Sequence, residues 1–377
     1  MNNLESLLSN NSDPVRSCAE LLEYIQINLY EGNEARLTQF YEQIPTILSL
    51  LFGTESNTGW IKIIGGYFPK DISVIYDLLC PVIGREGKNL FKTIMYPLGP
   101  VPTYTLPISV FPEYTQHLIR TKQFSDLSSF FHNLSELPEV QLKCLDRGSI
   151  ALSIEEYYLV MLLYSIKQSK SDSGMALLDS LAPDNALQSI YSINPLLVLF
   201  ARHIPALLTI KRPRVNLFDF FIMIIDELWL SDSYNSNKLI PLKIDKIQPM
   251  YNTQRGLMIN FPSSSVLEGL HALVYFVQQR SLLRKSSKPL VYPVNEEVSY
   301  EELFQTSMYL FFKTIIKNID NNQYQDHIFT ITVRDICELW LTYIQPWKAN
   351  VVLDELFFSL EIYQFNSTDP GNTLALL

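Results

Sequence analysis

The feature that most limits the fold of this chain is a series of helix-start signals, each followed by apolar residues at helical spacing. Asp13 precedes Pro14, which suits the first position of a helix because its missing N–H needs no partner there. Ser153 and Glu156 form a capping box in front of a long apolar run. Alternating apolar and polar residues, the pattern of half-buried strands, are scarce. The sequence therefore predicts an all-α fold of packed helical hairpins, with helix lengths that a solenoid would also allow.

Two segments depart from the helical pattern. Residues 97–112 are dense in proline, and each proline also pushes the preceding residue toward extended backbone. We expect an extended segment or an edge strand within residues 104–111. Residues 231–262 carry Ser and Asn clusters with weak periodicity, which favours a connector or flap. The predicted organisation is therefore an N-terminal helical region at 1–230, this connector, and a C-terminal helical region at 263–377.

Charge and composition exclude several classes of protein. The 377 residues carry a formal net charge of −10, which argues against a nucleic-acid partner because such partners require basic surface. The four cysteines lie far apart, so neither a disulfide framework nor a zinc site of paired thiolates is expected. Reduced thiols in a cytosol-facing protein are the simplest interpretation. The N-terminus lacks the pattern of a signal peptide, and no run reaches the ~20 apolar residues that span a bilayer.

Residues 334–347 are predicted to form a helix that Pro346 ends, because proline lacks the N–H that a continuing helix needs. Thr332 and Asp335 resemble a helix start whose side chains accept hydrogen bonds from the first turn. One stripe recurs at intervals of three and four: Val333, Ile336, Trp340 and Ile344. We therefore expect Trp340 to be buried between helices and Trp347 to fix the turn, with Trp347 the better placed of the two to meet lipid or a partner.

Six blocks of the sequence stand out by their aromatic, glycine and proline residues. They are residues 51–60 (LFG and GW), 74–79 with 104–112 (LPISVFP), 155–158 (EEYY), 226–230 (DELWL), 267–276 around His271, and 338–348 (ELWLTYIQPWK). In this order they resemble blocks of the sphingomyelin phosphodiesterase 4 family, also called neutral sphingomyelinase 3. The last block is the most specific, since the family pattern there reads EMWLSYLQPWR.

The resemblance implies a hydrolase that converts sphingomyelin to ceramide and phosphocholine with the help of Mg²⁺. It also implies association with the cytosolic face of endoplasmic reticulum, nuclear envelope or Golgi membranes. Family members are typically longer and end in a membrane-anchoring helix, which this sequence does not contain. We therefore expect either a fragment or a short form that reaches the membrane by another route.

The resemblance supplies no established catalytic set, and the sequence contains no common catalytic motif. The candidates for catalysis are Glu338, Asp226, Glu227 and His271. Asp335 and Glu338 are spaced to share one helix face and could hold one metal ion. A helix cap fully explains Asp335 without a metal and is the favoured interpretation, and His271 lies on an apolar helix where a core role is the commoner one. The residues expected to be structural family markers are Trp60, Trp229, Trp340, Pro346 and Trp347.

Two functions are therefore open. The first is a membrane-associated sphingomyelin phosphodiesterase, and the second is a non-catalytic helical scaffold or interaction protein at the endoplasmic reticulum or nuclear envelope. Stacked helices with no visible catalytic group favour the second, whereas the resemblance favours the first. A third reading, an all-α module that binds a small molecule, would require an apolar pocket lined by carboxylates and His271.

Overall fold

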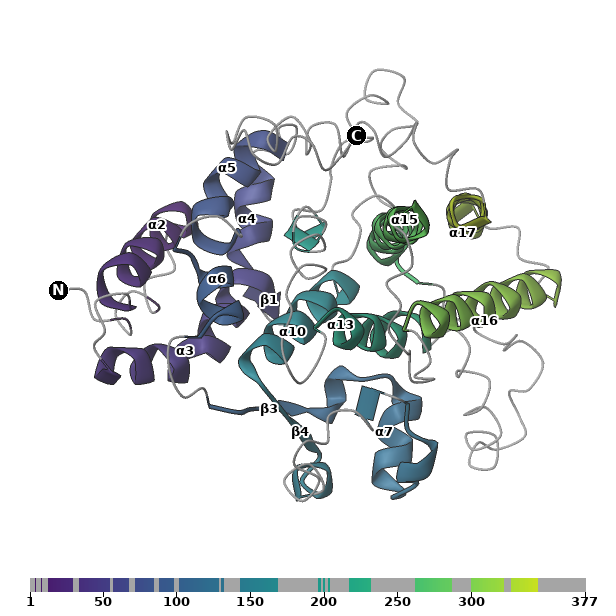
Figure 1. The fold of residues 1–377 in the computed structure, drawn as a ribbon, viewed down its shortest axis with the longest axis horizontal. Helices are drawn as coiled ribbons and strands as arrows, with labels where there is room; N and C mark the ends of the chain where they lie inside the picture. Colours follow the sequence, from purple (N-terminus) through teal and green to yellow (C-terminus); the bar gives the residue numbers. More distant parts are fainter. Residues whose placement is uncertain are drawn as a thin grey trace.

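A computed structural model describes residues 4, 8, 13–29, 34–54, 57–67, 72–84, 88–97, 102–128, 130–131, 143–168, 196–197, 199–200, 203, 217–231, 262–286, 300–321 and 327–344 (Figure 1). The α-helices are α2 (Pro14–Tyr24), α3 (Glu34–Phe52), α4 (Trp60–Tyr67), α5 (Ile72–Ile83), α6 (Leu90–Met95), α7 (Glu113–Arg120), α10 (Ile154–Gln168), α13 (Leu217–Ile225), α15 (Ser264–Ser286), α16 (Tyr300–Asn321) and α17 (His327–Ile344). Short π and 3₁₀ turns are η1 (Ile25–Leu29), η2 (Ile108–Val110), η3 (Phe124–Asp126) and η5 (Asp226–Leu230). The strands are β1 (Gly53–Thr54), β2 (Asn57–Thr58), β3 (Tyr104–Pro107) and β4 (Ser149–Leu152). The predicted all-α class is confirmed.

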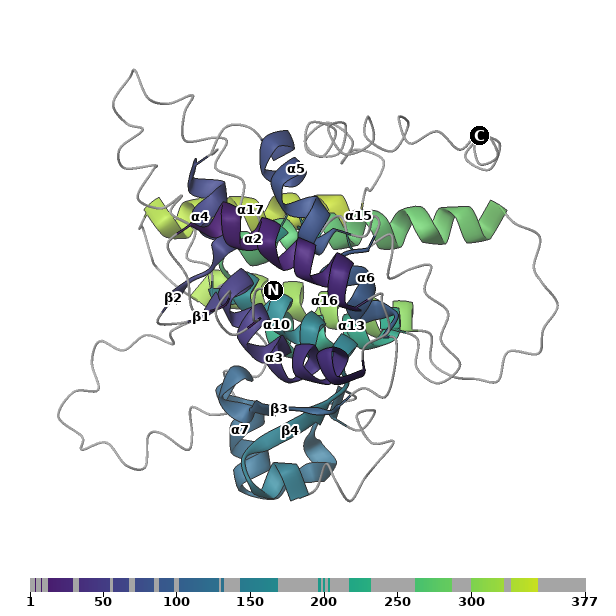
Figure 2. The same ribbon diagram turned by 90° about the vertical axis from the view of Figure 1, so that its left-hand side faces the viewer.

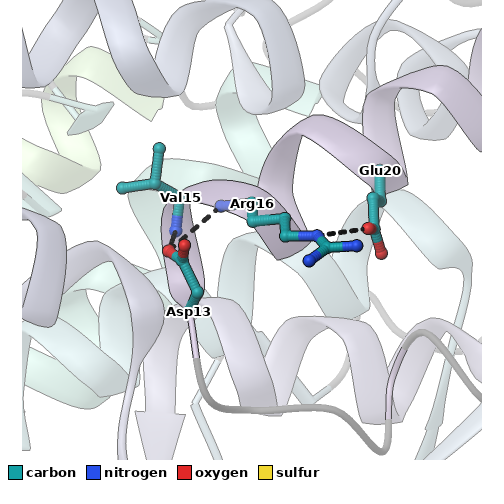
Figure 3. A network of polar contacts seen from close by, with 4 residues as sticks. All are labelled: Asp13, Val15, Arg16 and Glu20. Carbon is teal, nitrogen blue, oxygen red and sulfur yellow. Dashed lines mark hydrogen bonds and ion pairs between the residues drawn. The ribbon is translucent and has the colours of Figure 1, made fainter.

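The start of α2 shows how local chemistry fixes a helix end. The Asp13 carboxylate accepts hydrogen bonds from the backbone N–H of Val15 at 3.1 Å and of Arg16 at 3.3 Å (Figure 3). These bonds satisfy N–H groups that have no partner inside the helix. Arg16 Nε lies 2.8 Å from Glu20 Oε1 one turn later. Cap and proline thus begin the helix where the sequence predicts it.

A tight glycine turn joins α3 to α4. Strands β1 and β2 pair antiparallel, with Gly53 opposite Thr58, and Gly53 has a φ of 91°. A Cβ atom on Gly59 would lie 2.3 Å from the carbonyl carbon of Phe52. Only glycine fits this approach of two backbone segments. The turn places Trp60, which is 2% exposed, in the core.

The proline-rich segment contains the expected strand. Antiparallel β3 and β4 pair Tyr104 with Leu152 and Pro107 with Ser149. Together with α7, these strands lie to one side of the helices in both views (Figures 1 and 2). The Tyr104 hydroxyl donates to the Tyr41 carbonyl at 2.7 Å, which ties β3 to α3. The predicted extended segment is therefore confirmed and is anchored to the helical core.

Helix α10 lies at the centre of the core. Its capping box forms as predicted, with the Ser153 N–H donating to Glu156 Oε2 at 2.7 Å and the Glu156 N–H to Ser153 Oγ at 3.4 Å. The helix packs against α3, α6, α13 and α15. Buried residues from both predicted regions, 1–230 and 263–377, therefore belong to one core. The predicted connector is described only at residues 231 and 262, so its residues between them lie outside the described part of the chain.

Helix α17 differs from the prediction in two ways. It begins at His327, so Asp335 lies well inside the helix and is not its cap. Trp340 is 41% exposed, and the buried stripe consists of Ile336, Leu339 and Thr342. The prediction of a buried Trp340 was wrong because α17 packs on α15 through a neighbouring stripe, which shares only Ile336 with the predicted one.

The described part of the chain contains no helix that is both long and apolar enough to cross a bilayer. Its cysteines are free thiols, of which Cys18 and Cys80 are buried and Cys337 is exposed.

Candidate functional site

The six blocks are far apart in the sequence, and each of them contacts at least one other block. Rings of Phe52 and Tyr158 lie 5.5 Å apart between centroids, and those of Tyr104 and Tyr157 lie 5.2 Å apart. The Trp229 indole donates to the Leu163 carbonyl at 3.1 Å and lies against Gly269. These contacts are buried packing, which explains the aromatic and glycine residues of the blocks without any chemistry.

The last two blocks meet where α15 packs on α17. His271 of α15 and Thr342 of α17 form a hydrogen bond, with 3.3 Å between Nδ1 and Oγ1. The Thr342 hydroxyl also lies 3.0 Å from the Glu338 carbonyl, to which it donates. His271 is half-buried and Glu268, one turn before it on the same helix, is exposed. We call Glu268, His271, Asp335 and Thr342 the α15–α17 junction.

The junction holds two titratable groups with opposite shifts. Desolvation lowers the pKa of His271 to about 4, and a hydrogen bond with the Asp335 backbone partly opposes this. Desolvation, and then repulsion from the Asp335 carboxylate, raise the pKa of Glu268 to about 7. Glu268 still reaches solvent on one side, so water weakens both effects and a substrate can contact it. Near neutral pH the junction therefore offers a neutral imidazole beside a carboxyl group that retains protons.

Asp335 and Glu338, the predicted metal ligands, already share a cation. Arg334 Nη2 lies 3.2 Å from Asp335 Oδ1, and Arg334 Nε lies 3.6 Å from Glu338 Oε1. No cluster of three or more His, Cys, Asp or Glu side chains that could hold a metal occurs within the described ranges. As arranged here, both carboxylates pair with the exposed Arg334, so a Mg²⁺ ion bound by them would have to displace the guanidinium. Mg²⁺ stays a prediction from the resemblance alone.

The other two predicted catalytic acids, Asp226 and Glu227, belong to η5 and are not part of the junction. Glu227 of η5 is 2% exposed, and its carboxylate accepts a hydrogen bond from the Thr115 hydroxyl of α7. This bond ties α7 to the core. Glu227 therefore has a structural role, and its buried carboxylate is out of reach of a substrate. Asp226 is half-buried on the same turn.

The predicted family markers have three different outcomes. Trp60 and Trp229 are each 2% exposed and pack in the core, as a structural role requires. Trp340 is exposed, which contradicts its predicted burial. Pro346 and Trp347 lie outside the described residues.

Sequence reasoning missed Glu268 and Thr342 as members of the site. Ser265 and Glu268 have the spacing of a capping box, which would give Glu268 a role at a helix start, whereas the Ser263 hydroxyl makes the start by accepting from the Val266 N–H at 3.4 Å. A signal was available, because Glu268 and His271 are spaced to share one face of a helix. Their proximity to Asp335 depends on tertiary packing and has no sequence signature.

The two shifted groups predict a specific pH dependence of stability. Between pH 4.5 and about 7 the folded chain holds more protons on Glu268 than the unfolded chain, so stability falls as pH rises. For His271 the unfolded chain holds more protons between about pH 4 and 6.5, so stability rises with pH. The two trends oppose each other in wild type. In Glu268→Gln only the His271 effect remains, so the denaturant midpoint should rise with pH. In His271→Asn only the Glu268 effect remains, so the midpoint should fall. Both are measured from pH 4 to 8. Identical pH trends in both variants would contradict the junction as described.

Neither a protein-family model nor a curated protein nor a solved structure matches this chain.

Proposed function

We propose that this chain is a sphingomyelin phosphodiesterase acting at the cytosolic face of endoplasmic reticulum, nuclear envelope or Golgi membranes. The six blocks that resemble the family support this proposal. The observation that carries it is the hydrogen bond between His271 and Thr342, which joins the two C-terminal blocks in a part-buried position one turn from the exposed Glu268. The other block contacts described above are buried packing.

The junction residues suit the hydrolysis of a phosphodiester. Water attacks the phosphorus atom, the bond from phosphorus to the ceramide oxygen breaks, and phosphocholine and ceramide are released. A neutral His271 accepts the proton of the attacking water, and a protonated Glu268 donates a proton to the departing ceramide oxygen. Thr342 holds the imidazole, and the Asp335 carboxylate favours the protonated form of Glu268. No step is assigned to Mg²⁺.

The test is phosphocholine release by the purified full chain from sphingomyelin in mixed micelles, with Mg²⁺ varied from none to excess. We expect release by wild type and a loss of about 10²-fold or more in Glu268→Gln, because this change removes the proton donor and keeps the shape. The pH profile of kcat/KM should be bell-shaped, with limbs near the pKa of His271, about 4, and of Glu268, about 7.

Absence of release at every Mg²⁺ concentration, from protein whose circular dichroism shows an intact helical fold, would contradict the hydrolase proposal. That result would favour the non-catalytic scaffold at the same membranes. If Glu268→Gln releases phosphocholine at the wild-type rate, the chain is a hydrolase but its general acid is a residue other than Glu268.

A further inference from the structure

The last two turns of α17 present an apolar face to solvent. Trp340 is 41% exposed, Leu341 49% and Ile344 43%. Their spacing places them on one side of the helix, one turn after the exposed Cys337. Between residues 339 and 344 every exposed side chain is apolar, while Leu339 and Thr342 are buried toward α15. We call Trp340, Leu341 and Ile344 the α17 face.

Charge indicates the kind of surface that this face would contact. It carries no charged residue, and the arginine of the same helix, Arg334, is paired with Asp335 and Glu338. The whole chain has a net charge of −10, so an anionic leaflet would repel it. A leaflet of zwitterionic choline lipids presents no such repulsion. Tryptophan with adjacent aliphatic residues suits the boundary between headgroups and acyl chains, because its ring is amphipathic.

The place of the α17 face in the fold agrees with this partner. Leu341 directly precedes Thr342, which holds His271 of the α15–α17 junction. Seating the face in a leaflet would therefore bring the junction close to the level of the lipid headgroups. We infer that the α17 face is an interfacial membrane-docking surface that seats the chain on zwitterionic choline-lipid leaflets. This inference deepens the proposed function and rests on it for the identity of the substrate.

Binding of the full chain to vesicles of sphingomyelin and phosphatidylcholine tests the inference. The matched variants are Leu341→Asp with Ile344→Asp on α17, and Leu310→Asp with Ile316→Asp on α16, whose side chains are 39% and 43% exposed. We expect the α17 pair to weaken partitioning in a flotation assay about tenfold or more, and the α16 pair to leave it unchanged. Brominated lipid should quench tryptophan fluorescence in wild type, and Trp340→Leu should reduce that quenching. Trp60 and Trp229 are buried and should not respond.

Several results would overturn the inference. They are a wild-type chain that does not bind these vesicles, binding that requires anionic lipid, and equal losses in the α17 and α16 pairs. A change of oligomeric state in the α17 pair without a change in vesicle binding would assign the face to a second copy of the chain instead.

A second readout separates this inference from the proposed function. The α17 pair should hydrolyse a water-soluble nitrophenyl ester of phosphocholine at the wild-type rate, because the junction residues are unchanged. An inactive chain that binds vesicles through α17 would contradict the hydrolase and keep the docking surface. A chain that is active on the soluble ester but does not bind vesicles would support the hydrolase and contradict the docking surface.

Discussion

The His271→Asn variant is expected to release phosphocholine about 10²–10⁴-fold more slowly than wild type. Asparagine can keep a hydrogen bond to Thr342 but cannot accept the proton of the attacking water. Since His271 is half-buried at the surface, this change should leave the fold intact. The acidic limb of the pH profile, near pH 4, should disappear with the imidazole. The measurement is the initial rate of release across pH 4 to 9, with circular dichroism on the same samples.

Glu338→Ala is the matched control for this experiment. Glu338 is exposed on α17, and its carboxylate pairs with Arg334, at 3.6 Å. Its link to the junction runs through its backbone carbonyl, which accepts from Thr342 and is unaffected by the substitution. Exposed ion pairs stabilise little, so activity should stay within about twofold of wild type. If Glu338→Ala lowers the rate of phosphocholine release as much as His271→Asn does, Glu338 takes part in catalysis, which contradicts the roles given to the junction residues.

Gly59→Ala is expected to destabilise the fold by about 3 kcal/mol, at the upper end of the cost of overpacking. The added Cβ would lie 2.3 Å from the Phe52 carbonyl carbon, 2.4 Å from the Gly53 nitrogen and 2.5 Å from the Leu51 carbonyl oxygen. All three are backbone atoms, so no side-chain rotation relieves the clash. Displacing this turn would also displace Trp60 from the core. The measurement is the denaturant midpoint followed by circular dichroism, or the yield of folded protein if the variant does not fold.

Gly148→Asn controls for the general cost of replacing a glycine. Gly148 has a φ of 72°, and the nearest atom to an added Cβ is Ile108 Cδ1 at 3.9 Å. Asparagine tolerates this left-handed conformation, so the cost should be roughly 1 kcal/mol or less. Equal destabilisation in the two variants would show that backbone conformation, rather than the clash at Gly59, limits stability.

The helices with clear local signals were predictable, because the interactions that begin them involve neighbouring residues. Asp13 with Pro14, and Ser153 with Glu156, begin α2 and α10 where expected. Helix α3 likewise buries Phe40, Ile44 and Leu51, which recur at helical spacing. The strand within residues 104–111 followed from the prolines, although its partner, β4, carried no signal of its own.

The site was only partly predictable. His271 and Asp335 were both candidates, but nothing in the sequence placed them together. The spacing of Glu268 from Ser265 suggests a helix start rather than a catalytic acid. Glu227 was a catalytic candidate, but it is buried against Thr115. Burial and the distance between residues far apart in the chain decide these roles, and neither can be read from local spacing.

Helix α17 shows most clearly which features follow from local sequence and which follow from tertiary packing. A helix around residues 336–344 follows from local sequence alone, because the apolar residues there recur at helical intervals. These residues are apolar on more than one side, so periodicity did not determine which stripe is buried. Packing on α15 buries Ile336, Leu339 and Thr342 and leaves Trp340, Leu341 and Ile344 exposed. The same packing of α15 on α17 brings Asp335 close enough to Glu268 and His271 to shift the pKa values of both.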